Sequence, residues 1–223
     1  MKLSVIVPVH NEVDTIEESL DRVRRVGLDK EIIVVDDCST DGSRELLRKV
    51  PDVKLILQDR NMGKGMAIRS ALEHVAGDVV IIQDADLEYD PEDFYAMVEP
   101  LASGKADVVY GSRFLRGRPK MRLANFIANK VLAATASLLF GTRISDEATC
   151  YKAFRTEVIK GLTLTCRRFE FCPEVTAKLL RSGISIVEVP IRYEARSSAQ
   201  GKKIGWWDGV VAMWTLFKFR VVK

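Results

Sequence analysis

The chain has 223 residues, of which 47% are hydrophobic and 29% are charged, and its 34 basic and 31 acidic residues give a formal net charge of +3. This composition is typical of a folded globular protein, and it excludes disordered, collagen-like and coiled-coil chains. The length predicts a single large domain that can bury a substantial core.

The first half of the chain alternates short runs of β-branched residues with segments of helical periodicity. The runs predict strands that are buried on both faces, at Leu3–Val9, Glu31–Val35, Val53–Leu57, Val79–Gln83 and Ala106–Tyr110. The helical segments between them are Asp14–Val26, Asp41–Val50 and Lys64–Val75. Asp90 and Pro91 predict the N-cap and the first residue of a fourth helix, which ends before Gly104. This alternation predicts βαβ units and a mainly parallel sheet.

The pattern changes after the fifth predicted strand. Leu123–Phe140 is a long, weakly polar helical segment, Phe171–Ser182 predicts another helix, and Ile184–Ile191 predicts a strand. The last stretch, Trp206–Lys223, contains all three tryptophans together with interleaved lysine and arginine residues. No run of 18 uncharged apolar residues is present, so we do not expect a membrane-spanning helix.

The basic residues are concentrated in two segments. Residues 111–130 carry six basic and no acidic side chains, and residues 192–223 carry seven basic and two acidic ones, so the rest of the chain is net acidic. An acidic body with two basic segments indicates an anionic partner that binds at a defined place. A solvated basic face would give the same pattern.

The cysteines and the N-terminus predict the compartment. Cys38, Cys150, Cys166 and Cys172 show no C-x-x-C spacing, so we expect reduced, mostly buried thiols of a cytosolic protein rather than a metal site. Met1 leads directly into an apolar run without a charged region or a cleavage site, so a signal peptide is not expected.

Two aspartates follow the fourth predicted strand directly, in the sequence Gln83-Asp84-Ala85-Asp86-Leu87-Glu88. Ligands of open parallel sheets bind beyond the carboxyl ends of the strands. Two carboxylates one residue apart can turn toward one hard cation, and Glu88 could add a third oxygen. Such a site suits Mg²⁺ or Mn²⁺, which carboxylates hold together with substrate phosphates. The alternative is a solvated acidic turn that caps the next helix.

Polar residues also follow other predicted strands. Pro8-Val9-His10-Asn11-Glu12 ends the first strand, and Asp36-Asp37 ends the second, where a nucleoside could lie. Asn61-Met62-Gly63-Lys64-Gly65 places two glycines around a lysine at a helix start, which suits close approach to a phosphate. Neither G-x-x-x-x-G-K-[ST] nor G-x-G-x-x-G is present, so an ATPase or a dehydrogenase is not expected.

Together, these segments resemble the successive motifs of the family 2 glycosyltransferases. The resemblance rests, in chain order, on Pro8–Glu12, Asp36–Ser43, Asn61–Gly65, Asp84–Asp86 and Gly111–Arg113. It implies the GT-A fold, a single α/β domain with a Rossmann-like, mainly parallel sheet and helices on both faces. Residues 1–112 would form the nucleotide-sugar-binding half, and residues 113–223 the acceptor half with the basic and aromatic C-terminal segment.

The second half resembles one branch of this family, the synthases of dolichyl- or polyprenyl-phosphate mannose or glucose. The matching segments are Asp146–Arg155, Phe169–Phe171, Val187–Ile191 and the stretch from Arg196 to Lys203. The resemblance implies an inverting, metal-dependent transferase that moves a hexose from GDP-mannose or UDP-glucose to a polyprenyl phosphate. The chain departs from the branch at Cys150, where a glycine is common, and at residues 199–203, where Gly-x-Ser-Lys is usual.

The resemblance also implies roles for individual residues. The nucleotide-sugar site would contain Pro8, His10, Glu12, Asp37, Lys64, Asp84, Ala85 and Arg113. The metal, Mg²⁺ or Mn²⁺, would be bound by Asp84, Asp86 and Glu88, the last of which replaces a glutamine common in the branch. The acceptor phosphate would be bound by Arg122, Arg196, Lys202 and Lys203. The candidate catalytic residues are Asp86, Asp146 and Arg196.

The acceptor determines whether a general base is needed. Negative charge develops on the leaving nucleoside diphosphate, where the metal and basic side chains stabilise it. A lipid phosphate is already anionic and needs only positioning. A hydroxyl acceptor needs a base, for which Asp146 is the candidate, unless Asp146 only pairs with an arginine.

The basic segments also indicate contact with a membrane, because interfacial helices combine an apolar face with lysine, arginine and tryptophan. We therefore expect a peripheral enzyme at the cytoplasmic face of a membrane. In the alternative, Leu123–Phe140 packs in the core, and Trp206–Val222 docks on the body or on a second copy in a homo-oligomer. We do not expect a nucleic acid partner, since no recognition helix or stacking motif is present.

Three other functions remain as alternatives. A soluble transferase of the same fold would glycosylate a hydroxyl of a small molecule or glycan. A non-catalytic nucleotide-sugar-binding subunit would not need the intact pair Asp84 and Asp86. A nucleotidyltransferase is disfavoured because its glycine-rich N-terminal loop is missing.

Overall fold

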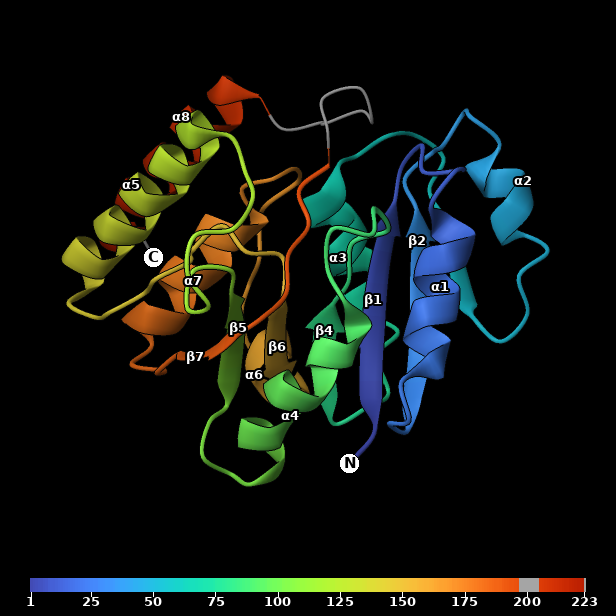
Figure 1. Cartoon of the computed structure of the whole chain (residues 1–223), viewed down its shortest axis with the longest axis horizontal. Helices are drawn as coiled ribbons and strands as arrows, with labels where there is room; N and C mark the ends of the chain where they lie inside the picture. The colour runs from blue at the N-terminus through green and yellow to red at the C-terminus, as the bar shows by residue number, and fades with distance from the viewer. Residues whose placement is uncertain (197–204, 223) are drawn as a thin grey trace.

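A seven-stranded sheet forms the centre of the molecule, with helices on both faces (Figure 1). The computed structural model describes residues 1–196 and 205–222. The strands lie in the order β3-β2-β1-β4-β6-β5-β7. Their bounds are β1 Leu3–Val9, β2 Lys30–Asp36, β3 Lys54–Leu57, β4 Val79–Ile82, β5 Val108–Ser112, β6 Lys152–Arg155 and β7 Val187–Pro190.

The first four strands pair in parallel, as the alternating pattern predicts, and β7 pairs in parallel with β5. The strand β6 was not predicted, and it lies antiparallel between β4 and β5. Its four residues are too few to show a strand periodicity, and two of them are Lys152 and Arg155. The sheet is therefore mixed but mainly parallel.

Four helices connect the strands of the first half. They are α1 Ile16–Arg25, α2 Ser43–Leu47, α3 Lys64–Leu72 and α4 Phe94–Ala102, the last preceded by a 3₁₀ turn at Pro91–Asp93. In Figure 1, α1 and α4 lie in front of the sheet and α3 lies behind it. The Asp90 side chain accepts the N–H of Glu92, so the predicted cap is confirmed. The helix α2 is shorter than predicted, since Pro51 disfavours the helical conformation at Val50.

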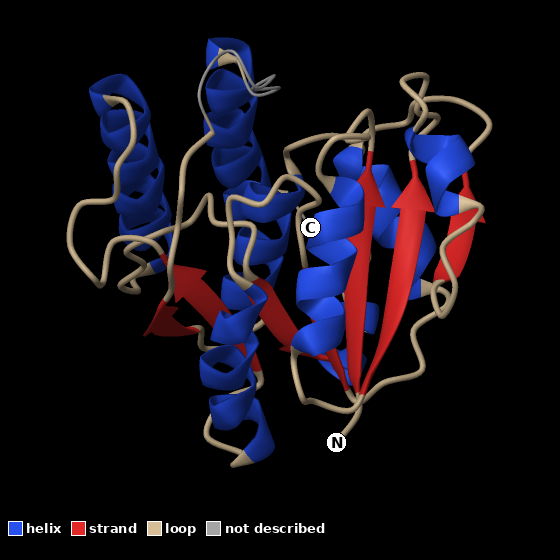
Figure 2. Cartoon of the chain, turned by 45° about the vertical axis from the view of Figure 1, so that its right-hand side comes forward, coloured by secondary structure: helices blue, strands red, loops and turns tan. Residues whose placement is uncertain are grey.

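The helices of the second half gather at one end of the sheet. They are α5 Leu123–Phe140, α6 Thr156–Lys160, α7 Phe171–Arg181 and α8 Trp206–Val221. Figures 1 and 2 show α5 and α8 side by side beyond the β5–β7 end of the sheet. They share a small core with the segment that follows α5, made of Leu132, Ala136, Ile144, Ala212 and Leu216.

Most of α5 faces outward, because only 17% of its residues are buried. Its length and mean hydropathy of 1.4 make it the one helix among residues 1–196 and 205–222 that could cross a membrane. This finding concerns length and composition only, and Lys130 interrupts the segment, so the expectation that no helix spans a membrane stays a prediction. The alternative that α5 packs in the core holds for Leu132, Ala133 and Ala136, which are buried, but not for the rest of the helix.

The main core positions the carboxyl ends of the central strands. Every residue of β4 is buried, and in β1 only Pro8 is not fully buried, so these strands have no exposed face. Helices pack on both sides of them, and their carboxyl ends lie together at the upper edge in Figure 1. Polar residues that follow β1, β2 and β4 are therefore brought to one edge.

A substitution at Gly111 in β5 can test how tightly the sheet packs against the segment after β7. A Cβ atom at this position would lie 2.7 Å from the Ile191 Cγ2 atom and 3.0 Å from the Tyr151 Cβ atom. We expect Gly111→Ala to lower the free energy of unfolding by about 1–3 kcal/mol, because overpacked cores are strained. Urea unfolding measures this. Gly209→Ala in α8, where a Cβ meets nothing within 4 Å, is the control and should not destabilise. Equal stability of both variants would contradict the packing.

Candidate active site

The carboxyl ends of β1, β2 and β4 open into a cavity of about 300 Å³, which we call the edge cavity. Nine of the predicted site residues line it, namely Pro8, His10, Glu12, Asp37, Lys64, Asp84, Ala85, Asp86 and Arg196. They come from segments that are far apart in the chain, and the parallel strands bring them together at one edge. The individual binding roles of these residues stay predictions.

Asp37 and His10 shape the wall of the edge cavity. The Asp37 carboxylate is buried and accepts the N–H groups of Met62 at 2.6 Å and Gly63 at 2.8 Å. The His10 ring lies 2.9 Å from the Asp37 carbonyl oxygen and 3.0 Å from the Asn61 side-chain nitrogen. These contacts fix the loop before α3 against the ends of β1 and β2.

The glycines at the start of α3 allow a close contact within the chain. Gly65 donates its N–H to the Arg168 carbonyl at 3.0 Å, and a Cβ atom there would lie 2.9 Å from the same oxygen. At Gly63 a Cβ atom would lie 2.5 Å from the Arg167 carbonyl oxygen. This contact brings Arg168 and Phe169 into the lining of the cavity. Composition and spacing gave no signal for Arg168. The predicted approach of a phosphate to this loop stays a prediction.

Lys64 neutralises Asp84. The Lys64 Nζ atom lies 2.5 Å from Asp84 Oδ1 and 3.2 Å from the Cys150 sulfur. Burial opposes the charge of Lys64, but the Asp84 carboxylate outweighs burial, so the pKa of Lys64 is raised well above its usual value. Burial, together with the Asp84 charge, also raises the pKa of the Cys150 thiol, which therefore stays protonated.

Arg196 reaches from the second half of the chain to two acidic groups in the edge cavity. Its guanidinium lies 2.9 Å from Asp86 Oδ2 and 3.0 Å from Glu12 Oε2. Burial raises the pKa of Asp86 to about 7, assisted by the negative charges of Asp84 and Glu88, while Arg196 acts in the opposite direction. Burial and the neighbouring negative charges therefore disfavour the ionised form of Asp86.

Glu88, the third predicted metal ligand, also contacts the segment after β7. Its carboxylate accepts the Tyr193 hydroxyl at 3.0 Å and the backbone N–H of Arg196 at 2.8 Å. Its role as a metal ligand stays a prediction. Within the described residues, no group of three histidine, cysteine or acidic side chains could hold a metal ion.

Asp84 and Asp86 nevertheless fit a divalent cation. Both line the edge cavity, and Glu12 and Asp37 line it as well. Mg²⁺ is commonly held by one or two carboxylates and completes its coordination with substrate phosphates and water. The two aspartates supply this minimal set, so the residues present suit Mg²⁺ or Mn²⁺ bound together with a diphosphate.

Asp146 is fully buried and paired with Arg113. Its carboxylate accepts the backbone N–H of Arg113 at 3.0 Å and two guanidinium N–H groups, both at 2.7 Å. Glu188 accepts the backbone N–H of Asp146, which fixes the loop. Both oxygens of the carboxylate are committed to Arg113. The geometry therefore agrees with the alternative of an arginine partner and disfavours the general-base role.

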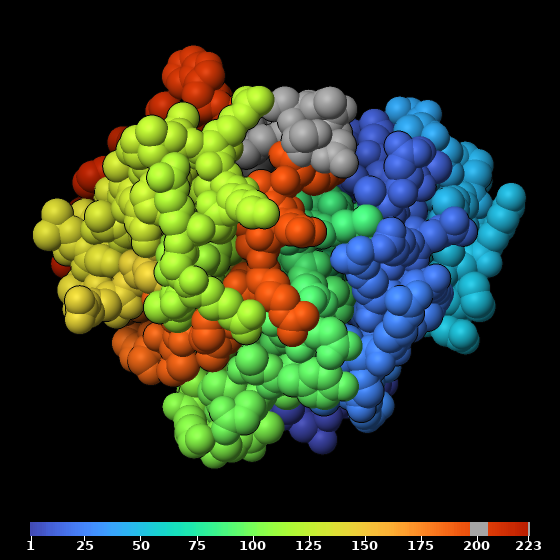
Figure 3. Space-filling model, in the orientation of Figure 1, coloured from blue at the N-terminus to red at the C-terminus, as the bar shows by residue number. Residues whose placement is uncertain are grey.

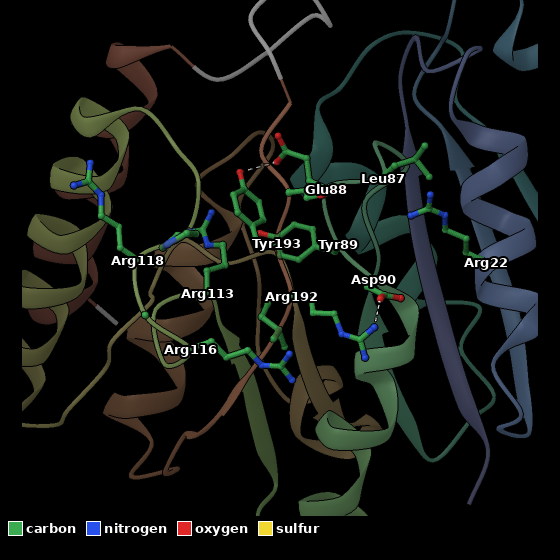
Figure 4. Close-up of a pocket in the computed structure, with 14 residues that line it drawn as sticks. Arg22, Leu87, Glu88, Tyr89, Asp90, Arg113, Arg116, Arg118, Arg192 and Tyr193 are labelled. Carbon is green, nitrogen blue, oxygen red and sulfur yellow. Dashed lines mark hydrogen bonds and ion pairs between the residues drawn. The ribbon is translucent and has the colours of Figure 1, made fainter.

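A second cavity of about 490 Å³, which we call the arginine cavity, lies beside the edge cavity (Figure 4). Its lining includes five arginines, which are Arg22, Arg113, Arg116, Arg118 and Arg192. Figure 4 shows Tyr89 and Tyr193 at its centre, with Arg22 on the opposite side from Arg113, Arg116 and Arg118. In the space-filling view, the segment after β7 runs up the front between the segments that follow β4 and β5 (Figure 3).

The predicted site residues Arg113 and Arg122 do not line the edge cavity. Arg113 lines the arginine cavity and not the edge cavity where the nucleotide sugar was predicted. Arg122, predicted for the acceptor phosphate, is exposed at the N-cap of α5 and lines neither cavity. Lys202 and Lys203 lie outside the described residues. Sequence reasoning missed the arginine cavity as a unit because its arginines come from three separate segments.

The family model for glycosyl transferase family 2 matches residues 4–163. The chain therefore belongs to the family 2 glycosyltransferases. It is 31% identical over 218 residues to the dolichol-phosphate mannosyltransferase of Pyrococcus furiosus. It is 33% identical over 210 residues to the undecaprenyl-phosphate 4-deoxy-4-formamido-L-arabinose transferase of Edwardsiella ictaluri. These matches cover 92% and 90% of this chain but 60% and 62% of the relatives, so the chain spans about three-fifths of their length.

Solved structures show the same fold. One is glucosyl-3-phosphoglycerate synthase from Mycobacterium tuberculosis in complex with Mn²⁺, uridine diphosphate and phosphoglyceric acid. The match has a TM-score of 0.77 and 20% sequence identity, and it covers 100% of this chain and 79% of that chain. The predicted GT-A fold in a single α/β domain is thereby confirmed.

The raised pKa of Asp86 predicts how metal binding depends on pH. A cation binds the ionised carboxylate, and with a pKa of about 7 the ionised fraction falls about tenfold between pH 8 and pH 6. We therefore expect the affinity of the protein for Mn²⁺, measured by isothermal titration calorimetry without nucleotide, to fall about tenfold over this range. Asp86→Asn should remove most of the binding, whereas the exposed control Asp52→Asn should not. An affinity that is constant between pH 6 and pH 8 would contradict the prediction.

Proposed function

We propose that this chain is an inverting, metal-dependent glycosyltransferase that moves a hexose from a nucleotide sugar, GDP-mannose or UDP-glucose, to a polyprenyl phosphate. Two of the relatives are a dolichol-phosphate mannosyltransferase and an undecaprenyl-phosphate 4-deoxy-4-formamido-L-arabinose transferase. The structural neighbour was solved with uridine diphosphate and Mn²⁺. These findings support a nucleotide-sugar donor, a divalent cation and a lipid phosphate acceptor.

The position of Asp146 is the observation that favours a phosphate acceptor. A hydroxyl acceptor needs a base to take its proton, and the candidate base is buried against Arg113. A phosphate oxygen is already anionic at neutral pH and attacks without losing a proton. The geometry therefore supports the phosphate acceptor over the alternative of a soluble transferase that acts on a hydroxyl.

The edge cavity supplies the donor side of the reaction. We assign the nucleoside to the wall formed by Pro8, His10 and Asp37, and the diphosphate to the side that carries Asp84 and Asp86. A divalent cation at these aspartates would offset the charge of the leaving diphosphate. Lys64 and Arg196 line the same cavity, and they would contribute to the same charge stabilisation.

The reaction itself needs one bond to form and one to break. An oxygen of the acceptor phosphate attacks the anomeric carbon from the face opposite the leaving group. The bond from that carbon to the donor diphosphate breaks, and the nucleoside diphosphate leaves with the electron pair. Because the two events occur on opposite faces, the anomeric configuration inverts.

The arginine cavity supplies a place for the acceptor phosphate next to the donor. The segment from Tyr193 to Arg196 separates the two cavities, and its last residue already reaches Asp86. Arg116 is about half exposed, and its ion pair with Asp93 is 4.0 Å long. Arginine suits phosphate because its planar guanidinium can bind two oxygens at once. Roles for Arg122, Lys202 and Lys203 in this binding remain part of the proposal.

A transfer assay tests the proposed function. The protein is incubated with Mn²⁺ and either GDP-mannose or UDP-glucose, and with either a polyprenyl phosphate or the corresponding alcohol. We expect transfer from one donor to the phosphate and none to the alcohol. Asp86→Asn should lower turnover at least about 100-fold, as expected when a group that stabilises the leaving group is lost. The control Asp52→Asn should keep full turnover.

The outcome also separates the alternatives. Transfer to the alcohol, or to a sugar hydroxyl, would reject the phosphate acceptor in favour of the soluble transferase. Full turnover in Asp86→Asn would reject the metal site. Binding of a nucleotide sugar without turnover on any acceptor would support the non-catalytic alternative.

We also propose that the protein lies peripherally on the cytoplasmic face of a membrane through the outer faces of α5 and α8, the α5–α8 surface. Its large apolar residues are between 45% and 85% exposed, and they are Leu123, Ile127, Val131, Leu138, Trp206, Trp207, Val210, Trp214, Phe217 and Val221. An apolar surface of this kind marks an interaction site. Exposed tryptophans next to Lys218 and Arg220 in α8 are typical of helices that lie in an anionic interface.

A vesicle assay tests the membrane contact. The double variant Trp206→Ser/Trp214→Ser removes two side chains that are 79% and 67% exposed, so it should leave the fold intact. We expect it to reduce sedimentation with phosphatidylglycerol-containing vesicles at least about fivefold, because burial of a large apolar side chain contributes about 1.5–3 kcal/mol. Leu57→Ser, at an exposed position in β3, is the control. Unchanged vesicle binding of the double variant would place the contact elsewhere.

A further inference from the structure

Each carboxylate of the Asp84–Asp86 pair is neutralised by a cation of the protein itself. Lys64, the first residue of α3, lies 2.5 Å from Asp84, and Arg196, in the segment after β7, lies 2.9 Å from Asp86. The four side chains are between 13% and 21% exposed. These ion pairs are therefore partly shielded from water, and they are stronger than pairs on an open surface.

Arg196 is held in place by more than its pair with Asp86. Its guanidinium also lies 3.0 Å from Glu12, and its backbone N–H donates to Glu88 at 2.8 Å. Glu88 accepts the Tyr193 hydroxyl as well, so the segment that carries Arg196 is fixed on both sides of the acidic pair. The arginine thus occupies a defined position across the edge cavity.

The Lys64 and Arg196 side chains lie where two ligands of the proposed reaction would need opposite charges. A divalent metal ion needs the carboxylates that now pair with Lys64 and Arg196, and it is repelled by the positive charge of these side chains. A nucleoside diphosphate needs positive groups in the same cavity, but the cations are committed to carboxylates. The two ligands together remove this conflict, since the metal takes over the carboxylates and the diphosphate receives the released cations.

We propose that Lys64 and Arg196 are built-in counter-ions of the Asp84–Asp86 pair, which a divalent cation displaces and which then bind the donor diphosphate. The proposal rests on the proposed function, because it takes the aspartates as the metal site. It makes metal and diphosphate bind cooperatively, since each favours the arrangement of the cations that the other needs. Arg196 accordingly has opposite effects on the two ligands.

Arg196→Gln tests this by calorimetry with Mn²⁺ alone and then with guanosine or uridine diphosphate at saturating Mn²⁺. The variant lacks the competing charge, so we expect it to bind Mn²⁺ alone at least about fivefold more tightly than the unaltered chain, at a pH at which Asp86 is ionised in both proteins. It also lacks a group that binds the diphosphate, so we expect diphosphate affinity to fall about tenfold or more. If Arg196 had only a structural role, the variant would bind both Mn²⁺ and the diphosphate more weakly.

Two further variants control the test. Arg24→Gln removes an arginine of α1 that pairs with Asp21 at 2.7 Å and lines neither cavity, and it should change neither affinity by more than twofold. Arg196→Lys keeps the charge and should bind Mn²⁺ as the unaltered chain does. Lys64→Gln repeats the test at Asp84, with the same opposite changes expected, and it decides the matter if Arg196→Gln does not fold.

The proposal is overturned if Arg196→Gln binds Mn²⁺ with equal or lower affinity, or if its diphosphate affinity is unchanged. These titrations contain neither a sugar nor an acceptor, so their outcome is independent of the transfer assay. Failure to transfer a hexose to a polyprenyl phosphate would reject the proposed function and leave the counter-ion role standing. Normal transfer by the unaltered chain, together with an unchanged Mn²⁺ affinity in Arg196→Gln, would leave the proposed function standing and reject the counter-ion role.

Discussion

The crowding of acidic side chains at the carboxyl edge of the sheet is the constraint on which the site depends. Asp84 and Asp86 follow one strand directly, and burial, assisted by the charges of Asp84 and Glu88, raises the pKa of Asp86 to about 7. The chain offsets this charge with a lysine at the start of α3 and an arginine after β7. The acidic pair therefore ties the second half of the chain to the first, because Arg196 bonds to residues on both sides of the cavity.

The same edge explains why two cavities lie next to each other. The strand β7 adds to the sheet beside β5, and the segment that follows it crosses the front of the molecule toward Asp86. One side of this segment faces the acidic groups and the other faces the arginines. Asp146 and Arg113 form a buried ion pair on the arginine side of this segment.

The extent of prediction from sequence differs between the fold and the site. The strands of the first half were predicted closely because buried parallel strands are continuous apolar runs, and β1 was predicted with its observed bounds. The strand β6 could not be predicted, since its place is given by its neighbours β4 and β5 rather than by its own four residues. Glu88 was predicted as a metal ligand from its spacing, but Tyr193 and Arg196, more than 100 residues later, determine where its carboxylate points.

The sequence by itself determined the family, the mainly parallel sheet and most residues that line the edge cavity. Motifs that follow parallel strands can be placed from sequence because the carboxyl ends of such strands lie at the same edge of the sheet. Only the tertiary structure decided which charges meet. Whether Asp146 is a base or the partner of Arg113, and whether Lys64 faces a ligand or Asp84, depends on groups that lie 33 and 20 residues apart in the chain. Ion pairs form between side chains that are close in space, and spacing along the chain does not record that closeness.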